Sequence, residues 1–226
     1  MEKVTFHSKD GLLITADYYK VAEPKSMILL CHRSHCNRAE YRETAPKFNT
    51  LGYSCLAIDQ RSGMNVFGAN NETKNRAKAQ NLPTGYLDAK PDIEAGIDFI
   101  YNLNEKKPII LLGSSYSAAL ALMISSENKK IKAIIVFSPN EYLKSVFLAA
   151  QIKSIKIPIF ATSAKKEISA VTEVFKWVNK KNITHFKPNE EGFHGSKILW
   201  ECVKGFEQHW FALAQFLNKI HIQNQR

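Results

Sequence analysis

The sequence predicts an α/β fold: a mostly parallel, doubly wound sheet with an antiparallel edge and helices on both faces. Three observations support this fold class, namely short apolar runs without polar alternation, segments of helical spacing between those runs, and two extended segments at the start of the chain. Apolar runs of this kind are typical of strands that are buried on both faces. Strands that alternate with helices form parallel sheets between two helical layers.

The two opening segments, residues 3–7 and 12–19, flank the dipeptide Asp10-Gly11, which is a strong turn signal. We therefore expect an N-terminal β-hairpin at the edge of the sheet. The apolar runs predict six further strands, at residues 27–31, 54–58, 109–112, 131–137, 157–161 and 183–186.

Helical spacing is clearest at Ile93, Ile97 and Ile100, which follow Pro91. Proline suits an early helical position because the first N–H groups of a helix have no partner within it. Helices are also predicted at residues 118–124, 171–178 and 198–217, the last of which would be a long closing helix.

The composition is that of an ordinary globular protein. The chain has 226 residues, of which 45% are hydrophobic and 23% charged, and this excludes a disordered chain. It contains no internal repeat and no linker rich in proline or serine, so we expect a single domain over residues 1–226. The net charge of +10 is spread over lysine pairs without interleaved aromatic residues, so we expect no nucleic-acid partner.

The lengths of the apolar runs and the first residues of the chain also predict the cellular compartment. None approaches the roughly 20 residues that a membrane span requires, and the first residues do not resemble a secretory signal. We therefore expect a cytoplasmic protein without membrane association. In that compartment the four cysteines are expected to remain reduced.

The strongest chemical signal is the segment Gly113-Ser114-Ser115-Tyr116-Ser117, which follows a buried strand and opens a helix of small residues. In such a strand–turn–helix context, a serine at the tip of a strained turn exposes its hydroxyl group as a nucleophile. Small residues are required two positions before and after it, and Gly113 and Ser117 meet this requirement. The alternative is a serine-rich helix N-cap without a catalytic role.

A serine nucleophile needs a general base, which is commonly a histidine later in the chain. Four histidines follow the serine: His185, His194, His209 and His221. His194 lies between glycines in a loop after the last predicted strand, whereas the others lie in a strand or in or near the closing helix. We therefore expect His194 to be the base.

The acid that orients the histidine can be narrowed by elimination. No aspartate follows Asp98, so an acid between the serine and the histidine must be a glutamate. Glu167 and Glu141 each follow a predicted strand. We expect Glu167, because a carboxylate there can orient a histidine from the loop after the next strand. Glu141 is the alternative.

Together these segments resemble the α/β-hydrolase family, in particular its small lid-less members near dienelactone hydrolases and carboxylesterases. The resemblance covers almost the whole chain. Besides the serine and histidine segments, it rests on residues 162–167 as the acid loop, residues 29–33 in place of the family's strand and His-Gly pair, and residues 58–63 in place of its Asp-x-Arg-Gly segment.

The resemblance implies an α/β-hydrolase fold without a cap domain, and hydrolysis of a small ester or related acyl substrate through an acyl-serine intermediate, with no cofactor. It also implies an oxyanion hole formed by the backbone N–H groups of Tyr116 and Arg33, with Ser34 as the alternative to Arg33.

Three positions depart from the family pattern: Ser117 and Arg33 replace glycines, and Glu167 replaces the commoner aspartate. A peptidase, an acyltransferase and a non-catalytic binding protein are the alternative functions, and we expect a monomer or a small homo-oligomer.

Residues 61–85 form an unusually long polar connection after a central strand. Ligands bind at the carboxyl ends of such strands, so we expect this segment to be a wall of the substrate pocket, with Met64 and Phe67 among its apolar contacts. The alternative is a solvated loop that these side chains anchor.

A metal site must also be considered, because residues 31–36 contain two cysteines and two histidines. Structural zinc sites usually join two separated ligand pairs, and no second pair occurs elsewhere. We therefore expect no metal, and expect His32 to brace the oxyanion loop.

Overall fold

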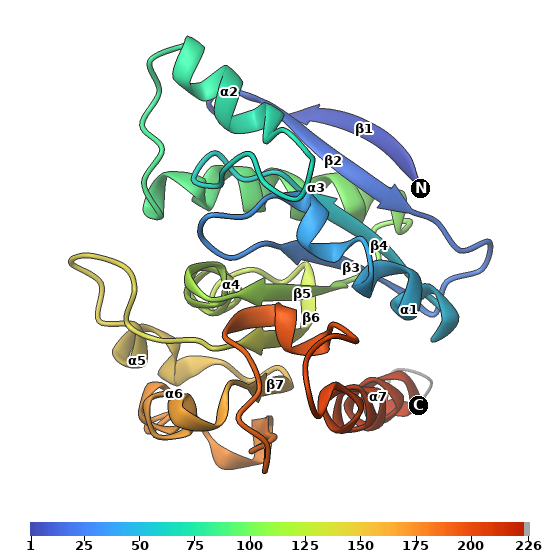
Figure 1. Cartoon of the computed structure of the whole chain (residues 1–226), viewed down its shortest axis with the longest axis vertical. Helices are drawn as coiled ribbons and strands as arrows, with labels where there is room; N and C mark the ends of the chain where they lie inside the picture. The colour runs from blue at the N-terminus through green and yellow to red at the C-terminus, as the bar shows by residue number, and fades with distance from the viewer. Residues whose placement is uncertain (224–226) are drawn as a thin grey trace.

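The computed structural model describes residues 1–223 and contains an eight-stranded sheet (Figure 1). The strands are β1 (Glu2–His7), β2 (Leu13–Tyr19), β3 (Ser26–Cys31), β4 (Tyr53–Ile58), β5 (Ile109–Ser114), β6 (Ile131–Phe137), β7 (Ile159–Thr162) and β8 (Ile183–His185), in the spatial order β1-β2-β4-β3-β5-β6-β7-β8. Strands β3 to β8 are parallel, while β2 pairs antiparallel with both β1 and β4. The predicted fold class is therefore confirmed, including the antiparallel hairpin.

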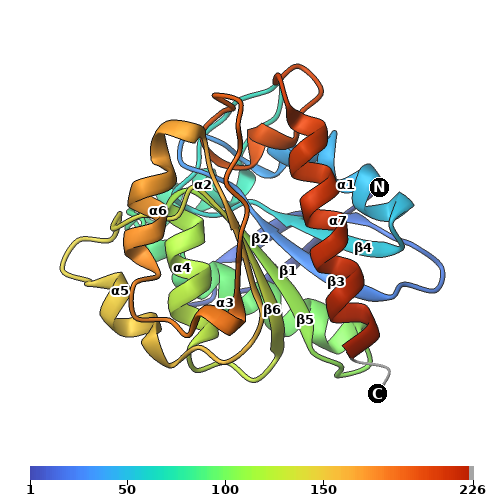
Figure 2. The ribbon, with the colours of Figure 1, turned by 90° about the horizontal axis from the view of Figure 1, so that it is seen from below.

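Helices cover both faces of the sheet (Figure 2). They are α1 (Thr44–Thr50), α2 (Glu72–Ala79), α3 (Lys90–Leu103), α4 (Tyr116–Ser125), α5 (Leu148–Gln151), α6 (Ile168–Val174) and α7 (Phe206–Gln223). Helices α1 and α7 pack on one face, and α3 to α6 pack on the other. No cap domain is evident within residues 1–223.

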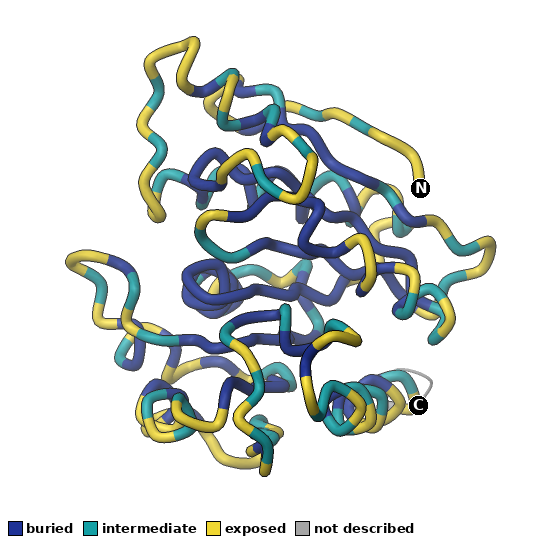
Figure 3. The backbone as a smooth tube through the Cα atoms, viewed as in Figure 1, coloured by how far each residue is buried: buried dark blue, intermediate teal, exposed yellow. Residues whose placement is uncertain are grey.

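The two helical layers explain why the strands are apolar without alternation. In β3, Ile28 and Leu30 pack toward α1 and α7, while Leu29 packs toward the opposite layer. All three side chains are fully buried, and Figure 3 shows the buried backbone concentrated in the central strands. The burial of successive side chains on opposite faces supplies the hydrophobic free energy that holds the three layers together.

The predicted helix over residues 198–217 is wrong in its first part. Gly195–Leu199 form a 3₁₀ helix, and α7 begins only at Phe206. Gly205 precedes α7 with a φ of +81°, a backbone conformation that does not continue an α-helix. The predicted helix over residues 171–178 is also shifted, since α6 spans Ile168–Val174.

The connection over residues 61–85 is not a loop throughout, because it contains helix α2. Asn71 caps this helix by accepting a hydrogen bond from the backbone N–H of Lys74. Ala77 is buried against the sheet, although most of the helix is polar. A helix with one buried alanine has little hydrophobic periodicity, so the sequence pattern does not predict it.

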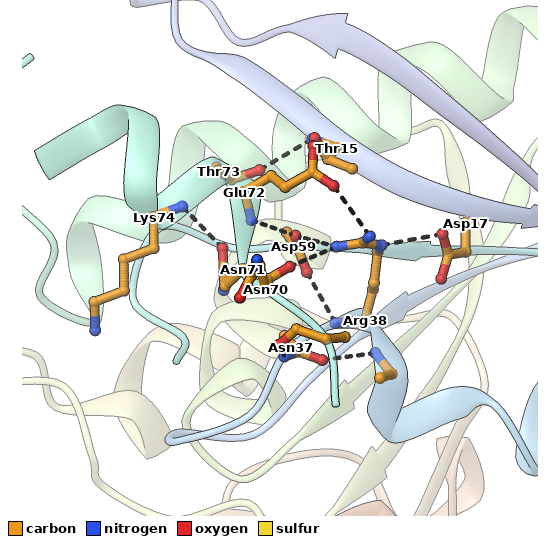
Figure 4. Close-up of polar contacts among 12 residues, drawn as sticks. Thr15, Asp17, Asn37, Arg38, Asp59, Asn70, Asn71, Glu72, Thr73 and Lys74 are labelled. Atoms are coloured by element: carbon orange, nitrogen blue, oxygen red, sulfur yellow. Dashed lines mark hydrogen bonds and ion pairs between the residues drawn. The ribbon is translucent and has the colours of Figure 1, made fainter. Parts of the chain in front are cut away.

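A buried ion-pair network holds α2 to the sheet (Figure 4). Arg38, in the 3₁₀ helix Arg38–Tyr41, donates to Asp17 at 3.0 Å, to Asp59 at 2.6 Å and to Glu72 at 3.3 Å. Asp59 also accepts hydrogen bonds from the backbone N–H groups of Arg38 and Glu72. The guanidinium group of Arg38 therefore joins its own 3₁₀ helix to β2, to the residue after β4 and to α2.

We expect Arg38→Met to lower the free energy of unfolding by about 3–5 kcal/mol, because it leaves the buried carboxylates of Asp17 and Asp59 without their cation. Urea unfolding of the wild type and the variant measures this difference. The matched control is Lys130→Met, whose ion pair with Asp98 has side chains 39% and 43% exposed and should contribute under about 1 kcal/mol. A loss for Arg38→Met no larger than for the control would contradict the prediction.

Candidate active site

Ser115 lies in a strained turn between β5 and α4. Its backbone has φ +60° and ψ −122°, a conformation that non-glycine residues rarely adopt. The turn is held by a hydrogen bond of 2.8 Å from the Ser115 N–H to the carbonyl oxygen of Phe137. A Cβ atom at Gly113 would lie 2.4 Å from the Ser117 carbonyl oxygen, so the turn requires glycine at that position.

The three side chains predicted to act together form one hydrogen-bonded chain. The Nε2 atom of His194 lies 2.8 Å from the Oγ atom of Ser115. Its Nδ1 atom lies 2.6 Å from the Oε1 atom of Glu167. The parallel strands β5 and β7 end at the same edge of the sheet, and there their following loops meet the histidine loop. The arrangement has the geometry required of a nucleophile, a general base and an orienting carboxylate.

The second carboxylate oxygen of Glu167 is also held in place. It accepts hydrogen bonds from the Ser138 hydroxyl at 2.6 Å and from the Ala164 N–H at 3.2 Å. Burial raises the pKa of Glu167, but the hydrogen bonds from His194 and Ser138 outweigh burial and hold the pKa below its usual value. The group is therefore a carboxylate at neutral pH, and it favours the histidine tautomer with the proton on Nδ1.

Glu141, the alternative acid, has a different position. Its two carboxylate oxygens accept hydrogen bonds from the backbone N–H groups of Leu148, at 2.7 Å, and Ala149, at 3.0 Å. These N–H groups begin helix α5, and a carboxylate at a helix start satisfies groups that have no partner within the helix. Glu141 is thus placed as a helix cap.

The two predicted oxyanion donors differ in their surroundings. Tyr116 is the first residue of α4, so its N–H has no acceptor within the helix. The Arg33 N–H, by contrast, donates to the carboxyl group of Glu40 at 2.9 Å. This hydrogen bond argues against Arg33 as an oxyanion donor, because the N–H is already committed to a partner inside the protein. Ser34, the alternative, is left as the candidate in this loop.

His32 connects the oxyanion loop to the end of β4. Its Nε2 atom accepts a hydrogen bond of 3.0 Å from the Gln60 N–H, and its Nδ1 atom lies 2.8 Å from the Arg33 carbonyl oxygen. Burial lowers the pKa of His32 to about 4, so the ring is neutral at neutral pH. Among residues 1–223, no group of three or more His, Cys, Asp or Glu side chains is arranged to hold a metal ion.

Several residues at the site were not singled out from the sequence. Ser138 joins the acid loop to the histidine loop, because its hydroxyl donates to Glu167 and accepts from the Gly195 N–H at 2.9 Å. The ring of Tyr142 meets that of His194 edge-on, with centroids 6.4 Å apart. Ser138 directly follows β6. A polar residue at the carboxyl end of a central strand is the sequence feature that could have identified it as part of the site.

Met64 and Phe67, the predicted substrate contacts, lie at the surface of the segment over residues 61–85. Their exposed fractions are 43% and 36%. The Asn37 side-chain amide donates to the carbonyl oxygen of Met64, and the ring of Phe67 packs edge-on against Trp200, with centroids 5.3 Å apart. Neither of these two contacts involves Ser115 or His194, and the role of Met64 and Phe67 in substrate binding stays a prediction.

The described chain includes no helix that is both long enough and apolar enough to cross a membrane. The profile of the family described as "Serine aminopeptidase, S33" matches residues 22–192, about three quarters of the chain. The search of curated protein sequences found no match to this chain.

Among solved structures, the chain is similar to the esterase Pf2001 of Pyrococcus furiosus, with a TM-score of 0.74, 18% identity, and coverage of 96% of this chain and 91% of that one. A thermostable carboxyl esterase of Bacillus coagulans has a TM-score of 0.74, 12% identity, and coverage of 97% and 98%. A dienelactone hydrolase of Anabaena variabilis has a TM-score of 0.71, 13% identity, and coverage of 98% and 96%. At these identities the likeness shows a shared fold.

Proposed function

Since the chain belongs to the serine aminopeptidase S33 family and is a serine hydrolase of the α/β-hydrolase superfamily, we propose that it hydrolyses small carboxylic esters through an acyl-serine intermediate. The observation that carries the proposal is the hydrogen-bonded chain from Ser115 through His194 to Glu167. Three of the solved structures that share the fold are named esterases or a dienelactone hydrolase, and this supports an ester as the substrate.

In the proposed reaction, the Oγ atom of Ser115 attacks the carbonyl carbon of the ester while the Nε2 atom of His194 takes its proton. Glu167 keeps the imidazole in the required tautomer and stabilises its protonated form. His194 then gives the proton to the departing alcohol. A water molecule activated by the same histidine attacks the acyl-serine, and the carboxylic acid leaves.

The oxyanion of each tetrahedral intermediate would be stabilised by the N–H of Tyr116 together with that of Ser34. Helix α4, which begins at Tyr116, adds the positive end of its dipole. This assignment follows from the hydrogen bond that occupies the Arg33 N–H.

The family description makes an aminopeptidase the second candidate. A peptide with a free amino terminus carries a positive charge close to the bond to be cleaved. The guanidinium carbon of Arg33 lies 5.8 Å and the Lys197 amine 4.4 Å from the ring centroid of Phe193, the residue before His194. Cations next to the residue that precedes the proposed base are unfavourable neighbours for a positively charged amino terminus, so the ester stays the first candidate.

Ser115→Ala should abolish hydrolysis of p-nitrophenyl acetate and labelling by a fluorophosphonate probe, because both require the serine hydroxyl group. Steady-state kinetics and gel-based labelling measure these two effects, and circular dichroism checks that the fold is retained. Undiminished labelling of the variant would remove Ser115 from the mechanism. A wild type that hydrolyses no acyl ester faster than the variant would favour the non-catalytic binding protein.

Glu167→Gln should lower kcat by about 10²-fold or more, because it removes the carboxylate that sets the histidine tautomer and stabilises the imidazolium. The matched control is Glu141→Gln, which alters a carboxylate that follows the preceding strand and caps α5. We expect the control to keep kcat nearly unchanged and to lose only some stability. If the two variants exchanged these effects, Glu141 would be the orienting acid.

We also propose that Met64 and Phe67 contact the acyl chain of the substrate. Replacing either by alanine should lower kcat/KM for long p-nitrophenyl acyl esters more than for the acetate, since only long chains would reach these side chains. The matched control is Phe147→Ala, another exposed aromatic residue that packs against Trp177 beside α5. Equal ratios of long-chain to short-chain kcat/KM in all three variants and the wild type would exclude both residues from recognition.

A further inference from the structure

Glu40 is a fully buried acid that the proposed mechanism does not use. It lies in the 3₁₀ helix Arg38–Tyr41, and its exposed fraction is 0%. The ion pairs among residues 1–223 include none to its carboxyl group. Burying a carboxyl group costs free energy unless hydrogen bonds satisfy its oxygens. The partners of this group therefore indicate what it does.

Three N–H and O–H donors reach the carboxyl group of Glu40, and the Cys36 thiol lies beside it. The Arg33 N–H donates to Oε2 at 2.9 Å, and the hydroxyl groups of Ser114 and Ser196 both donate to Oε1, the first at 3.0 Å. The Ser196 N–H also donates to the Ser114 hydroxyl oxygen at 2.8 Å, which closes a ring of hydrogen bonds. Both carboxyl oxygens of Glu40 are therefore hydrogen-bonded from inside the protein.

The three donors lie in or directly beside the three loops on which the proposed chemistry depends, and Ser114 is the last residue of β5. Ser114 immediately precedes the nucleophile, Ser196 lies two residues after His194, and Arg33 immediately precedes Ser34 in the oxyanion loop. These loops are far apart in the sequence, and Glu40 is hydrogen-bonded to each of them. It makes no hydrogen bond with Ser115 or His194 themselves.

We propose that Glu40 is a positioning residue that sets the distance between Ser115 and His194 and the direction of the oxyanion loop. The inference rests on the proposed ester hydrolysis. A carboxyl group suits this task because two acceptor oxygens can hold three donors from different directions. Displacing a reacting group by about 1 Å can cost roughly 10²-fold in rate, so a shift of one loop should be visible in the kinetics.

Glu40→Gln tests the proposal with little change in shape. An amide has one acceptor oxygen, so its NH₂ group must face either the Arg33 N–H or the two serine hydroxyl groups. A backbone N–H cannot reverse its direction, so the amide oxygen should face the Arg33 N–H and the NH₂ group should face the two serine hydroxyl groups. Both hydroxyl groups must then accept where they donated before, and their hydrogens lose the acceptor that they have in the wild type. Because Ser114 and Ser196 are fully buried, we expect this loss to displace one of the two residues.

We expect Glu40→Gln to lower kcat for p-nitrophenyl acetate by roughly 10-fold or more with little change in KM, and to slow fluorophosphonate labelling to a similar degree. The matched control is Asp17→Asn, which alters a buried carboxylate on β2 that is hydrogen-bonded to Arg38. The control should lower the unfolding midpoint and leave kcat unchanged. A similar kcat in Glu40→Gln and in the control would overturn the proposal.

Ser196→Ala provides a second, smaller change, because it removes one of the three donors and keeps the Ser196 N–H. It should lower kcat by a smaller factor, and the double variant with Glu40→Gln should lose less than the product of the single losses, since both act through one network. If Glu40→Gln does not fold, Ser196→Ala alone decides: a kcat equal to that of the wild type overturns the proposal. These outcomes differ from failure of the proposed function, in which the wild type itself would not exceed Ser115→Ala.

Discussion

The strained backbone of Ser115 is the constraint on which the active-site geometry depends. A residue in this conformation costs on the order of 1–3 kcal/mol and persists only where its surroundings fix it. Here β5 ends directly before it and α4 begins directly after it, so two buried elements determine its position. The Phe137 carbonyl oxygen holds its N–H, and the Ser117 hydroxyl donates to the His32 carbonyl oxygen. The sheet and its helices thereby supply the free energy that holds one serine in a strained turn at the carboxyl edge of the sheet.

The loops around this turn are joined to one another by polar contacts at the edge of the sheet. Ser138 joins the acid loop to the histidine loop, and His32 joins the oxyanion loop to the end of β4. Each of these side chains has partners on both sides, so it orders two segments at once. A site assembled from several separate loops can therefore be rigid although each loop lacks a core of its own.

Much of the fold and the identity of the candidate triad could be predicted from the sequence, because both depend on local patterns. Buried strands give continuous apolar runs, and glycines flank His194 where the chain must turn. The closing helix was placed too early because aromatic residues with helical spacing continue through Gly205, where the backbone turns. The role of the Arg33 N–H could not be predicted, because it depends on the position of its acceptor, Glu40. The packing that fixes Glu40 involves Ser114 and Ser196, which lie more than 70 residues from it in the sequence.

The neutral ring of His32 has a consequence for the behaviour of the protein in acid. Its pKa in the folded state is about 4, below its value of 6.5 in an unfolded chain, so the unfolded chain binds a proton first as the pH falls. The contribution of this histidine to stability is complete above pH 6.5 and is lost progressively toward pH 4. Protonation of its Nε2 atom also removes the acceptor of the Gln60 N–H. Between pH 6.5 and pH 4 the fold therefore loses stability while the folded protein keeps the hydrogen bond between His32 and Gln60, and the attachment of the oxyanion loop fails only as the pH approaches 4.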